Sequence, residues 1–177
     1  MIYDVIIIGG GPAGLMTAVQ LEKEGVNNYL LIEKNHEIGK KLLITGGKRC
    51  NVTNNLPIEE FINSLTIKNK KFLYPALYTF GPEQIITFFK DNGLKLILEN
   101  NFKYFPETNK SKSILDKLLM NIDSSKIKCN IHISKVSKVD SVYHIKTDTG
   151  LFKSKNIVIA TGSNSFPDTG SDGYRIK

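Results

Sequence analysis

Residues 3–14 read Tyr-Asp-Val-Ile-Ile-Ile-Gly-Gly-Gly-Pro-Ala-Gly, and this stretch decides the fold. The β-branched run Val5–Ile8 is typical of a strand that is buried on both faces, at the centre of a parallel sheet. The glycines that follow have the G-x-G-x-x-G spacing. Gly9 allows a tight turn, Gly11 lets the backbone approach a pyrophosphate, and Gly14 permits close packing of a helix on the strand. We interpret the stretch as a turn that binds a dinucleotide.

A helix is expected directly after this turn. Pro12 suits its first position, where the missing N–H is not needed, and Gly25 suits a left-handed residue at its end. The free N–H groups of the first helical turn would face the phosphates. Pro12 and Ala13 therefore join the three glycines as candidate cofactor-binding residues.

An acidic residue follows the second expected strand, Tyr29–Ile32. Glu33 lies nineteen residues beyond Gly14, where a carboxylate would bind the ribose hydroxyls of a dinucleotide. A carboxylate there repels a 2′-phosphate, so FAD or NAD is favoured over NADP. Lys34, the next residue, is included in the same candidate site. The alternative is an ordinary β-α-β unit with a glycine turn and a solvated glutamate.

The composition, with 41% apolar and 23% charged residues among 177, is that of a soluble globular protein. This length allows one domain with a sizeable core. Cys50 and Cys129 lack metal-ligand spacing, which disfavours a disulfide framework or a zinc site. The apolar run is too short to span a bilayer, and no basic leader precedes it. We therefore expect no membrane association and a cytoplasmic location.

The net charge of +7 raises the question of nucleic-acid binding. The lysines are scattered, with the densest clusters at residues 68–71 and 110–112. We find no aromatic-interleaved basic motif beside these clusters, so a solvated basic surface is the preferred interpretation and no nucleic-acid partner is expected.

The second informative stretch is residues 35–54, which begins at the carboxyl edge of the expected sheet, where ligands bind in doubly wound folds. Gly46 and the glycine after it would allow the backbone to approach a ligand closely. Lys41 or Arg49 would offer charge to a diphosphate or a flavin carbonyl. His36 is interpreted as an exposed loop histidine. A flexible loop with solvated lysines explains the composition equally well.

Residues 39–54 read Gly-Lys-Lys-Leu-Leu-Ile-Thr-Gly-Gly-Lys-Arg-Cys-Asn-Val-Thr-Asn. This segment resembles the G-[RK]-K-L-[LI]-[IV]-[ST]-G-G-G-R-C-N-x-T-N signature of the BaiN-type, aminoacetone-oxidase-like family of FAD-dependent oxidoreductases. The resemblance adds Cys50 and Asn51 to the candidate cofactor-binding residues. Lys48 is a departure, because the family commonly has a third glycine there. Arg49 would lower the pKa of Cys50 and make it a redox thiol, although no second cysteine has C-x-x-C spacing.

Residues 56–125 give weaker signals. Helical pieces are expected within residues 61–80, broken at Pro75, and helices over 82–92 and 113–121. Residues 95–99 and 102–105 are expected to form a hairpin. Four aromatic residues of this region are interpreted as core rather than as a platform for flavin stacking: Phe72, Tyr74, Tyr78 and Phe80.

Residues 131–154 are expected to form a β-meander, and the run of residues 157–162 is expected to be a strand that ends in an Ala-Thr-Gly turn. Resemblance to flavoproteins implies that this strand returns to the centre of the sheet. By resemblance to two-domain flavoproteins, Val136 is the candidate for the adenine edge, while a plain core valine is the alternative. The same resemblance places Ala160, Thr161 and Gly162 against the diphosphate end of FAD, where small residues are required. This favours FAD over NAD. Residues 163–174 are similar to a further family motif, S-[YF]-P-x-T-G-S-x-G-D-G-Y, with two residues missing.

The expected fold class is α/β, with one Rossmann-like FAD-binding domain over residues 1–177 that has a central parallel sheet and an antiparallel meander. The resemblance implies hydride transfer through flavin N5 to or from a small organic substrate, such as a small amine or an unsaturated steroid-like ketone. NAD(P)H is the candidate electron donor. Family members are more than twice as long, so their substrate domain and returning C-terminal segment are expected to be absent.

An NAD-binding module or a flavoprotein acting on RNA, suggested only by the glycine pattern and the charge, is one alternative to this oxidoreductase. The other is a truncated, non-catalytic fragment that binds FAD or NAD. Such a chain would form a homodimer to cover an exposed sheet edge. The sequence assigns no catalytic residue and no metal ligand.

Overall fold

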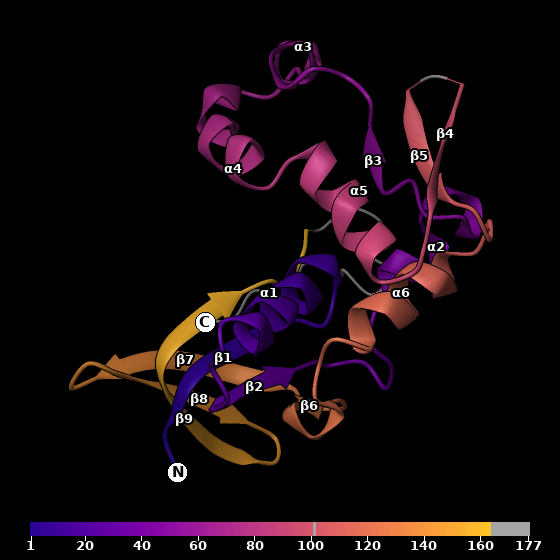
Figure 1. Ribbon diagram of the computed structural model, residues 1–177. Coiled ribbons are helices and arrows are strands. Elements are labelled where there is room, and N and C mark those ends of the chain that lie inside the picture. The colour runs from indigo at the N-terminus through magenta and orange to yellow at the C-terminus, as the bar shows by residue number, and fades with distance from the viewer. Residues whose placement is uncertain (101, 164–177) are drawn as a thin grey trace. The chain divides into compact units, whose positions relative to one another are not determined.

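The computed structural model describes residues 1–100 and 102–163. The chain divides into two compact units, and Figure 1 labels their helices and strands. The first unit consists of Met1–Ile44 and Leu118–Lys177, and the second of Thr45–Lys117. The sequence predicts one domain and gives no signal for the second unit.

The first unit is built on a six-stranded sheet with the order β6-β2-β1-β9-β8-β7. β1 (Tyr3–Ile8) lies between β2 (Tyr29–Ile32) and β9 (Gly150–Ile159), and it is parallel to both. β6 (Ile127–Lys128) pairs in parallel with β2. The two strands predicted around the glycine turn therefore lie at the centre of a parallel sheet.

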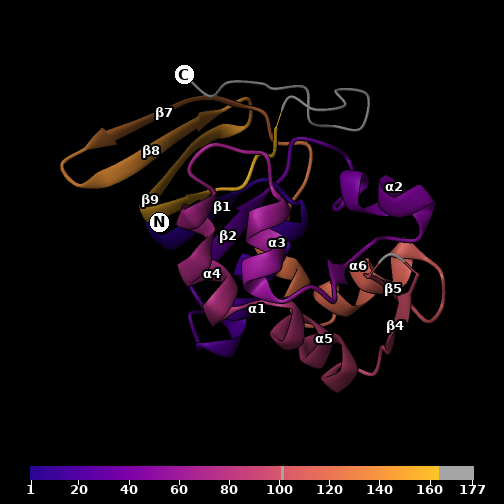
Figure 2. The same ribbon diagram turned by 90° about the horizontal axis from the view of Figure 1, so that it is seen from above.

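The other side of the sheet is antiparallel. β7 (Ile133–Val139), β8 (Val142–Thr147) and β9 form a meander, which Figure 2 shows from above. The predicted α/β class, with a parallel centre and an antiparallel meander, is confirmed.

β9 is one strand, whereas the sequence predicts two. It pairs with β8 from Gly150 to Ser154 and with β1 as far as Ile159. The hydroxyl of the buried Ser154 donates a hydrogen bond to the Asn156 carbonyl at 2.6 Å. Pairing with β8 on one side and β1 on the other keeps the chain extended through this point. The strand ends at Ile159, directly before the predicted turn at Ala160–Gly162.

β1 is buried on both faces, as its β-branched run predicts. Ile6 and Ile8 pack in a core of aliphatic side chains from β2, β7, β8 and the loop before β7. Ile7 points to the opposite face, where its side chain lies next to Gly14 of α1 (Pro12–Lys23). The helix buries a row of small and aliphatic residues: Gly14, Leu15, Ala18 and Val19.

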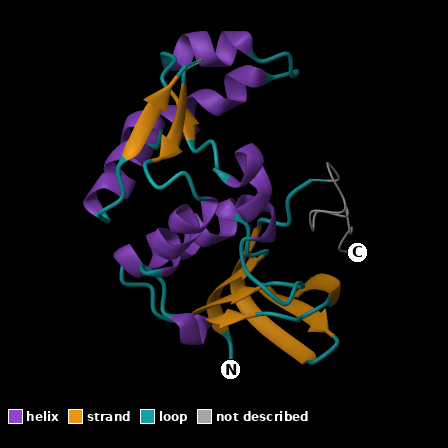
Figure 3. Ribbon diagram, turned by 90° about the vertical axis from the view of Figure 1, so that its right-hand side faces the viewer, coloured by secondary structure: helices purple, strands orange, loops and turns teal. Residues whose placement is uncertain are grey.

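The second unit contains a three-stranded antiparallel sheet, visible in Figure 3, with the order β3-β5-β4. β4 (Leu96–Glu99) and β5 (Lys103–Pro106) form the predicted hairpin. β3 (Thr53–Asn54) pairs with β5. The sequence does not predict β3, because two residues carry no periodic pattern.

Most helices of this region agree with the prediction. α5 (Pro82–Asp91) and α6 (Ser111–Leu119) match the two expected helices. Pro75 lies in the first turn of α4 (Tyr74–Thr79), so it begins a helix rather than breaking one. The other helical elements are α2 (Lys40–Lys48), α3 (Ile58–Ser64), and the 3-10 turns η1 (Lys70–Leu73) and η2 (Ser124–Lys126).

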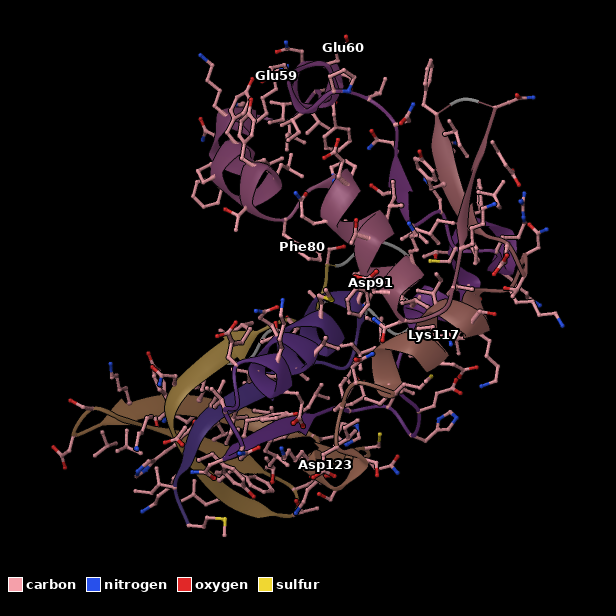
Figure 4. The ribbon with its side chains drawn as sticks, in the orientation of Figure 1. Glu59, Glu60, Phe80, Asp91, Lys117 and Asp123 are labelled. Atoms are coloured by element: carbon pink, nitrogen blue, oxygen red, sulfur yellow. The ribbon has the colours of Figure 1, made fainter. Side chains whose placement is uncertain are left out.

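The prediction that the aromatic cluster forms core is wrong. Phe72 is 86% exposed, Tyr78 is 56% exposed and Phe80, labelled in Figure 4, is 38% exposed. The short helices η1 and α4 bury no residue. Aromatic spacing near a six-residue helix therefore did not report burial. Other elements and loops supply the buried apolar residues of this unit: Ile62, Phe89, Leu94, Leu96, Phe105, Ile114 and Leu115.

Candidate functional site

The site begins at the turn between β1 and α1, where the backbone segments touch. Gly9 has a φ of +108°, and a Cβ there would lie 2.5 Å from the Ala160 carbonyl oxygen. A Cβ on Gly14 would lie 1.9 Å from the Gly9 carbonyl oxygen. A Cβ on Gly10, which the sequence does not single out, would lie 2.3 Å from Ile38 Cδ1. Backbone atoms therefore exclude a side chain at Gly9 and Gly14, and a side chain at Gly10 would require that of Ile38 to move.

Gly11 differs from its neighbours, because its missing side chain faces open space. A Cβ at Gly11 would meet no protein atom within 4 Å. Gly11 is the N-cap of α1, and no side chain caps the helix there. The first N–H groups of a helix have no partner within the helix, and those of Ala13 and Gly14 belong to this turn. A helix N-terminus with open space in front of it fits an anionic group such as a diphosphate.

Glu33 is buried, with 7% of its surface exposed. Its Oε2 accepts a hydrogen bond from the Gly10 amide at 2.7 Å, and its Oε1 accepts one from the Asn35 amide at 2.8 Å. The carboxylate therefore holds the glycine turn against the end of β2, and the alternative of a solvated glutamate is wrong. A carboxylate oxygen can accept two hydrogen bonds, so Oε2 keeps capacity for a ribose hydroxyl. The ribose contact stays a prediction.

The residues after β9 return to the same turn. The Ala160 amide donates to the Ile8 carbonyl at 2.8 Å, and the Ala160 carbonyl lies against Gly9. Gly162 has a φ of +80°, which glycine adopts at low cost. The structure thus brings Ala160 beside the glycine turn, with the exposed Thr161 following it. The contact of this segment with FAD stays a prediction, and the motif expected after Ser163 lies outside the described residues.

The other predicted residues of the first unit have mixed surroundings. Val136 lies opposite Ile145 of β8 and packs against the aliphatic core, as the alternative of a core valine requires. Its adenine contact stays a prediction. Lys34 and Lys41 are half-buried. The side chain of His36 is 74% exposed, which confirms the exposed loop histidine.

The remaining predicted site residues lie in the second unit, in the loop formed by residues 45–51. Gly46 has a φ of +56°, and a Cβ there would lie 2.7 Å from the Asn51 amide nitrogen. The Asn51 side chain is exposed. Arg49 pairs with Glu99, and its Nη2 donates to Asn109 Oδ1 at 2.7 Å. Glu99 therefore supplies a counter-charge to Arg49 within this unit.

Cys50 is buried, and burial raises the pKa of its thiol, although a hydrogen bond with Thr45 acts in the opposite direction. The guanidinium of Arg49 bonds to Glu99 and Asn109 instead. The prediction that Arg49 lowers the pKa of Cys50 is therefore wrong. A buried, protonated thiol is a poor nucleophile, so the structure does not support a redox role.

A partly buried ion pair at the end of α1 escapes the sequence analysis. Glu22 Oε1 accepts hydrogen bonds from Lys126 Nζ at 2.9 Å, from the Tyr29 hydroxyl at 2.8 Å and from the Asp123 amide at 3.1 Å (Figure 4 labels Asp123). Desolvation of Glu22 opposes its charge, but these hydrogen bonds outweigh it and lower the pKa of the carboxyl. Burial also raises the pKa of the Tyr29 phenol. The cluster ties α1 to β2 and η2.

The second unit has a hollow of about 510 Å³ between the loop after β3, α3, α4 and the start of α5. The Tyr78 hydroxyl at its wall donates a hydrogen bond to Glu59, which Figure 4 labels. None of the predicted site residues lines this hollow.

Residues 1–100 and 102–163 show neither a metal-binding cluster nor a membrane-spanning helix. Within these ranges, no group of three or more His, Cys, Asp or Glu side chains is placed to hold a metal ion. No helix in the same ranges is both long enough and apolar enough to cross a bilayer.

Comparison with known proteins places this glycine turn in a family. The sequence profile of the HI0933-like protein Rossmann domain matches residues 3–177. The chain belongs to the HI0933-like Rossmann domain family. This is a family of FAD-dependent oxidoreductases, so the resemblance seen in the sequence is confirmed.

Two curated proteins show how much of a longer protein the HI0933-like domain represents. The chain is 27% identical over 170 residues to the 3-dehydro-bile acid delta(4,6)-reductase of Clostridium scindens, covering 94% of this chain and 41% of that protein. It is 27% identical over 179 residues to the ribosomal RNA dihydrouridine synthase of Haemophilus influenzae, covering 97% of this chain and 43% of that protein. The chain thus spans about two fifths of the length of these relatives.

Solved structures support the HI0933-like fold. Cyclohexanone monooxygenase from Rhodococcus sp. Phi1, bound to NADP+, matches with a TM-score of 0.54 and 11% identity, over 92% of this chain and 26% of that one. A mutant of the amino acid oxidase NikD matches with a TM-score of 0.51 and 14% identity, over 92% of this chain and 52% of that one. At these identities the likeness concerns the fold alone.

Proposed function

We propose that this chain is the FAD-binding part of an oxidoreductase that transfers hydride to or from a small organic substrate. The observation that supports it most is the open space at Gly11, in front of an uncapped helix N-terminus. Glycine is a favourable N-cap, and here it also keeps the space in front of the helix clear, although the extended, uncrowded backbone would admit a side chain. A bound diphosphate would occupy the space that glycine leaves open.

In this proposal the first unit holds the nucleotide. The amides at the start of α1 bind the diphosphate, and Gly11 gives it room. Glu33 keeps the turn in shape through the Gly10 amide and accepts a hydrogen bond from the ribose with its remaining lone pair. The segment from Ala160 closes the turn from the other side. Further proposed contacts of this unit are those of Lys34, Lys41, Val136, Thr161 and Gly162, whereas the contacts expected of Gly46 and Asn51 in the second unit stay predictions.

When bound, FAD supplies hydride transfer through its flavin ring, and NAD(P)H is the proposed electron donor. The relatives are named as a reductase of a 3-dehydro bile acid and as a synthase of dihydrouridine, a reduced pyrimidine, in ribosomal RNA. We therefore favour reduction of an unsaturated organic substrate over oxidation of an amine. A cytoplasmic location and a homodimer through an exposed sheet edge remain predictions.

The alternative function is binding of FAD or NAD without catalysis. The visible spectrum of the purified chain, followed by titration with FAD and with NAD, shows which nucleotide the chain binds. Flavin absorbance and NAD(P)H consumption with an unsaturated acceptor would support the oxidoreductase. Flavin without turnover would support the alternative, and a chain that binds neither nucleotide would contradict both.

A further inference from the structure

Asn35, two residues after Glu33 in the first unit, makes two hydrogen bonds to the same carboxylate oxygen. Its backbone amide donates to Glu33 Oε1 at 2.8 Å, and its side-chain Nδ2 donates to that oxygen at 2.5 Å. An ionised carboxylate offers about four acceptor positions, two on each oxygen. Asn35 therefore fills the acceptor positions of Oε1.

The second oxygen of Glu33 lies at the glycine turn. Oε2 accepts a hydrogen bond from the Gly10 amide at 2.7 Å. The Gly10 carbonyl accepts one from the Gly39 amide at 2.9 Å, so this peptide is held on both sides. Within the part of the chain that the structure describes, these three hydrogen bonds are the ones that the carboxylate accepts. One acceptor position therefore remains for a ligand, and it is on Oε2.

The main chain fixes Asn35 beside the carboxylate. The Asn35 carbonyl accepts a hydrogen bond from the Asn130 amide at 3.1 Å. The Glu33 amide donates to the Lys128 carbonyl at 2.8 Å, and the Glu33 carbonyl accepts from the Ile131 amide at 3.1 Å. Residues 33–35 are thus joined at both ends to one segment, residues 128–131, which belongs to the same unit. This bracing keeps Nδ2 in place against Oε1.

We propose that Asn35 is a positioning residue, which turns the Glu33 carboxylate so that only Oε2 serves the nucleotide and Glu33 accepts from one ribose hydroxyl. Without Asn35, the carboxylate would have an oxygen for each of the two neighbouring hydroxyls. The inference rests on the proposed binding of FAD and deepens it, because it names the oxygen that receives the ribose. Asn35 acts through Glu33 and does not itself touch the cofactor.

The first test compares FAD with two analogues, in which the adenosine ribose lacks either the 2′-hydroxyl or the 3′-hydroxyl. Removal of the hydroxyl that donates to Oε2 should weaken binding roughly 10- to 150-fold, because one hydrogen bond to a charged group is lost. Removal of the other should change the affinity by less than about twofold. Similar large losses for both analogues would overturn the proposal, because Glu33 would then accept from both hydroxyls.

Asn35→Ala tests the positioning role itself. Because Oε1 regains an acceptor position, the carboxylate is no longer turned one way, and the preference for one hydroxyl over the other should fall at least about threefold. Asn35→Asp keeps the shape of the side chain but replaces the donor with a second carboxylate, so it should weaken FAD binding at least as much as alanine. Equal weakening of FAD and both analogues, with unchanged ratios, would show a merely structural role and reject the proposal.

Controls separate this inference from folding and from the proposed function. Asn28 is a matched asparagine in the same unit, whose exposed Nδ2 donates to the Ile2 carbonyl at 3.1 Å, and Asn28→Ala should leave the ratios unchanged. Hydrogen exchange of the Gly10 amide without FAD should speed up in Asn35→Ala, because Glu33 is held less firmly against it. Unchanged exchange would reject the positioning role. Faster exchange in this variant, beside a wild-type chain that binds no FAD, would reject the cofactor proposal alone.

Discussion

Gly11→Ala should separate cofactor binding from folding. The backbone at Gly11 is extended, with φ −81° and ψ −175°, so alanine adopts it without strain. The added Cβ meets no protein atom within 4 Å. The remaining cost is the poorer N-cap, about 0.5–1 kcal/mol in the free energy of unfolding. The variant is therefore expected to fold.

The same methyl group would occupy the space through which a diphosphate approaches the amides of α1. Loss of one hydrogen bond to a charged group costs about 1.5–3 kcal/mol. This corresponds to FAD binding that is weaker by roughly 10- to 150-fold. Gly11→Ala should thus keep the fold and lose most of its affinity for FAD.

The assay combines urea unfolding, followed by circular dichroism, with a fluorescence titration of FAD. Gly14→Ala is the matched control, because its Cβ would lie 1.9 Å from the Gly9 carbonyl oxygen. The backbone moves aside less easily than a side chain, so the free energy of unfolding of this variant should fall by about 1–3 kcal/mol or more. A Gly11→Ala chain that binds FAD as tightly as the wild type would refute the placement of the diphosphate.

Three further predictions follow from the packing and charges. Glu22→Gln should lower the free energy of unfolding by about 1–2 kcal/mol at neutral pH and flatten its decline in acid. Because the pKa of Glu22 is lowered in the folded state, the carboxylate stabilises the protein above pH 4.5, and this stabilisation is lost as the pH falls through the folded pKa. An unchanged pH profile of urea unfolding in the variant would contradict this role of Glu22. Burial raises the pKa of both thiols, but Cys50 is buried and Cys129 is half-buried, so Cys50 should react with iodoacetamide more slowly; rapid labelling of native Cys50 would be inconsistent with this. Phe72→Ala should change stability by less than about 0.5 kcal/mol, whereas the buried Phe89→Ala should cost about 3–5 kcal/mol; equal losses would show that the exposed aromatic cluster is core after all.

The parts of the fold that the sequence predicts are those with local signals. The run Val5–Ile8, the spacing of the glycines and the left-handed Gly25 each act within a few residues, and β1 and α1 form where these signals place them. Tyr29–Ile32 matches β2 residue for residue. The turn was predictable because its geometry depends on which residues lack a Cβ.

The parts that escape prediction depend on distant partners. The two residues of β3 become a strand only because Tyr104 and Lys103 lie opposite them. The sequence predicts two strands where the structure has one, β9. Its two halves pair with different neighbours, β8 and β1, and the sequence does not show that these pairings continue into one another. Pairing with strands far away in sequence leaves no periodic trace in the segment itself.

The site shows the same division. Glu33 was predicted from its place after β2, but its bond to the Gly10 amide, twenty-three residues away, follows only from the folded turn. Arg49 was assigned to the cofactor from its charge and its place in the stretch after the second strand, whereas its partners Glu99 and Asn109 lie 50 and 60 residues further along. A motif identifies which residues matter, and the three-dimensional contacts decide what each of them does.

The most direct test of the account is a crystal structure of this chain grown with FAD. We expect the diphosphate within hydrogen-bonding distance of the amides of Ala13 and Gly14, with its phosphate oxygens over Gly11 and the ribose beside Glu33. A nucleotide bound at another surface of the chain, or saturating FAD that leaves this turn without a diphosphate, would contradict the central claim.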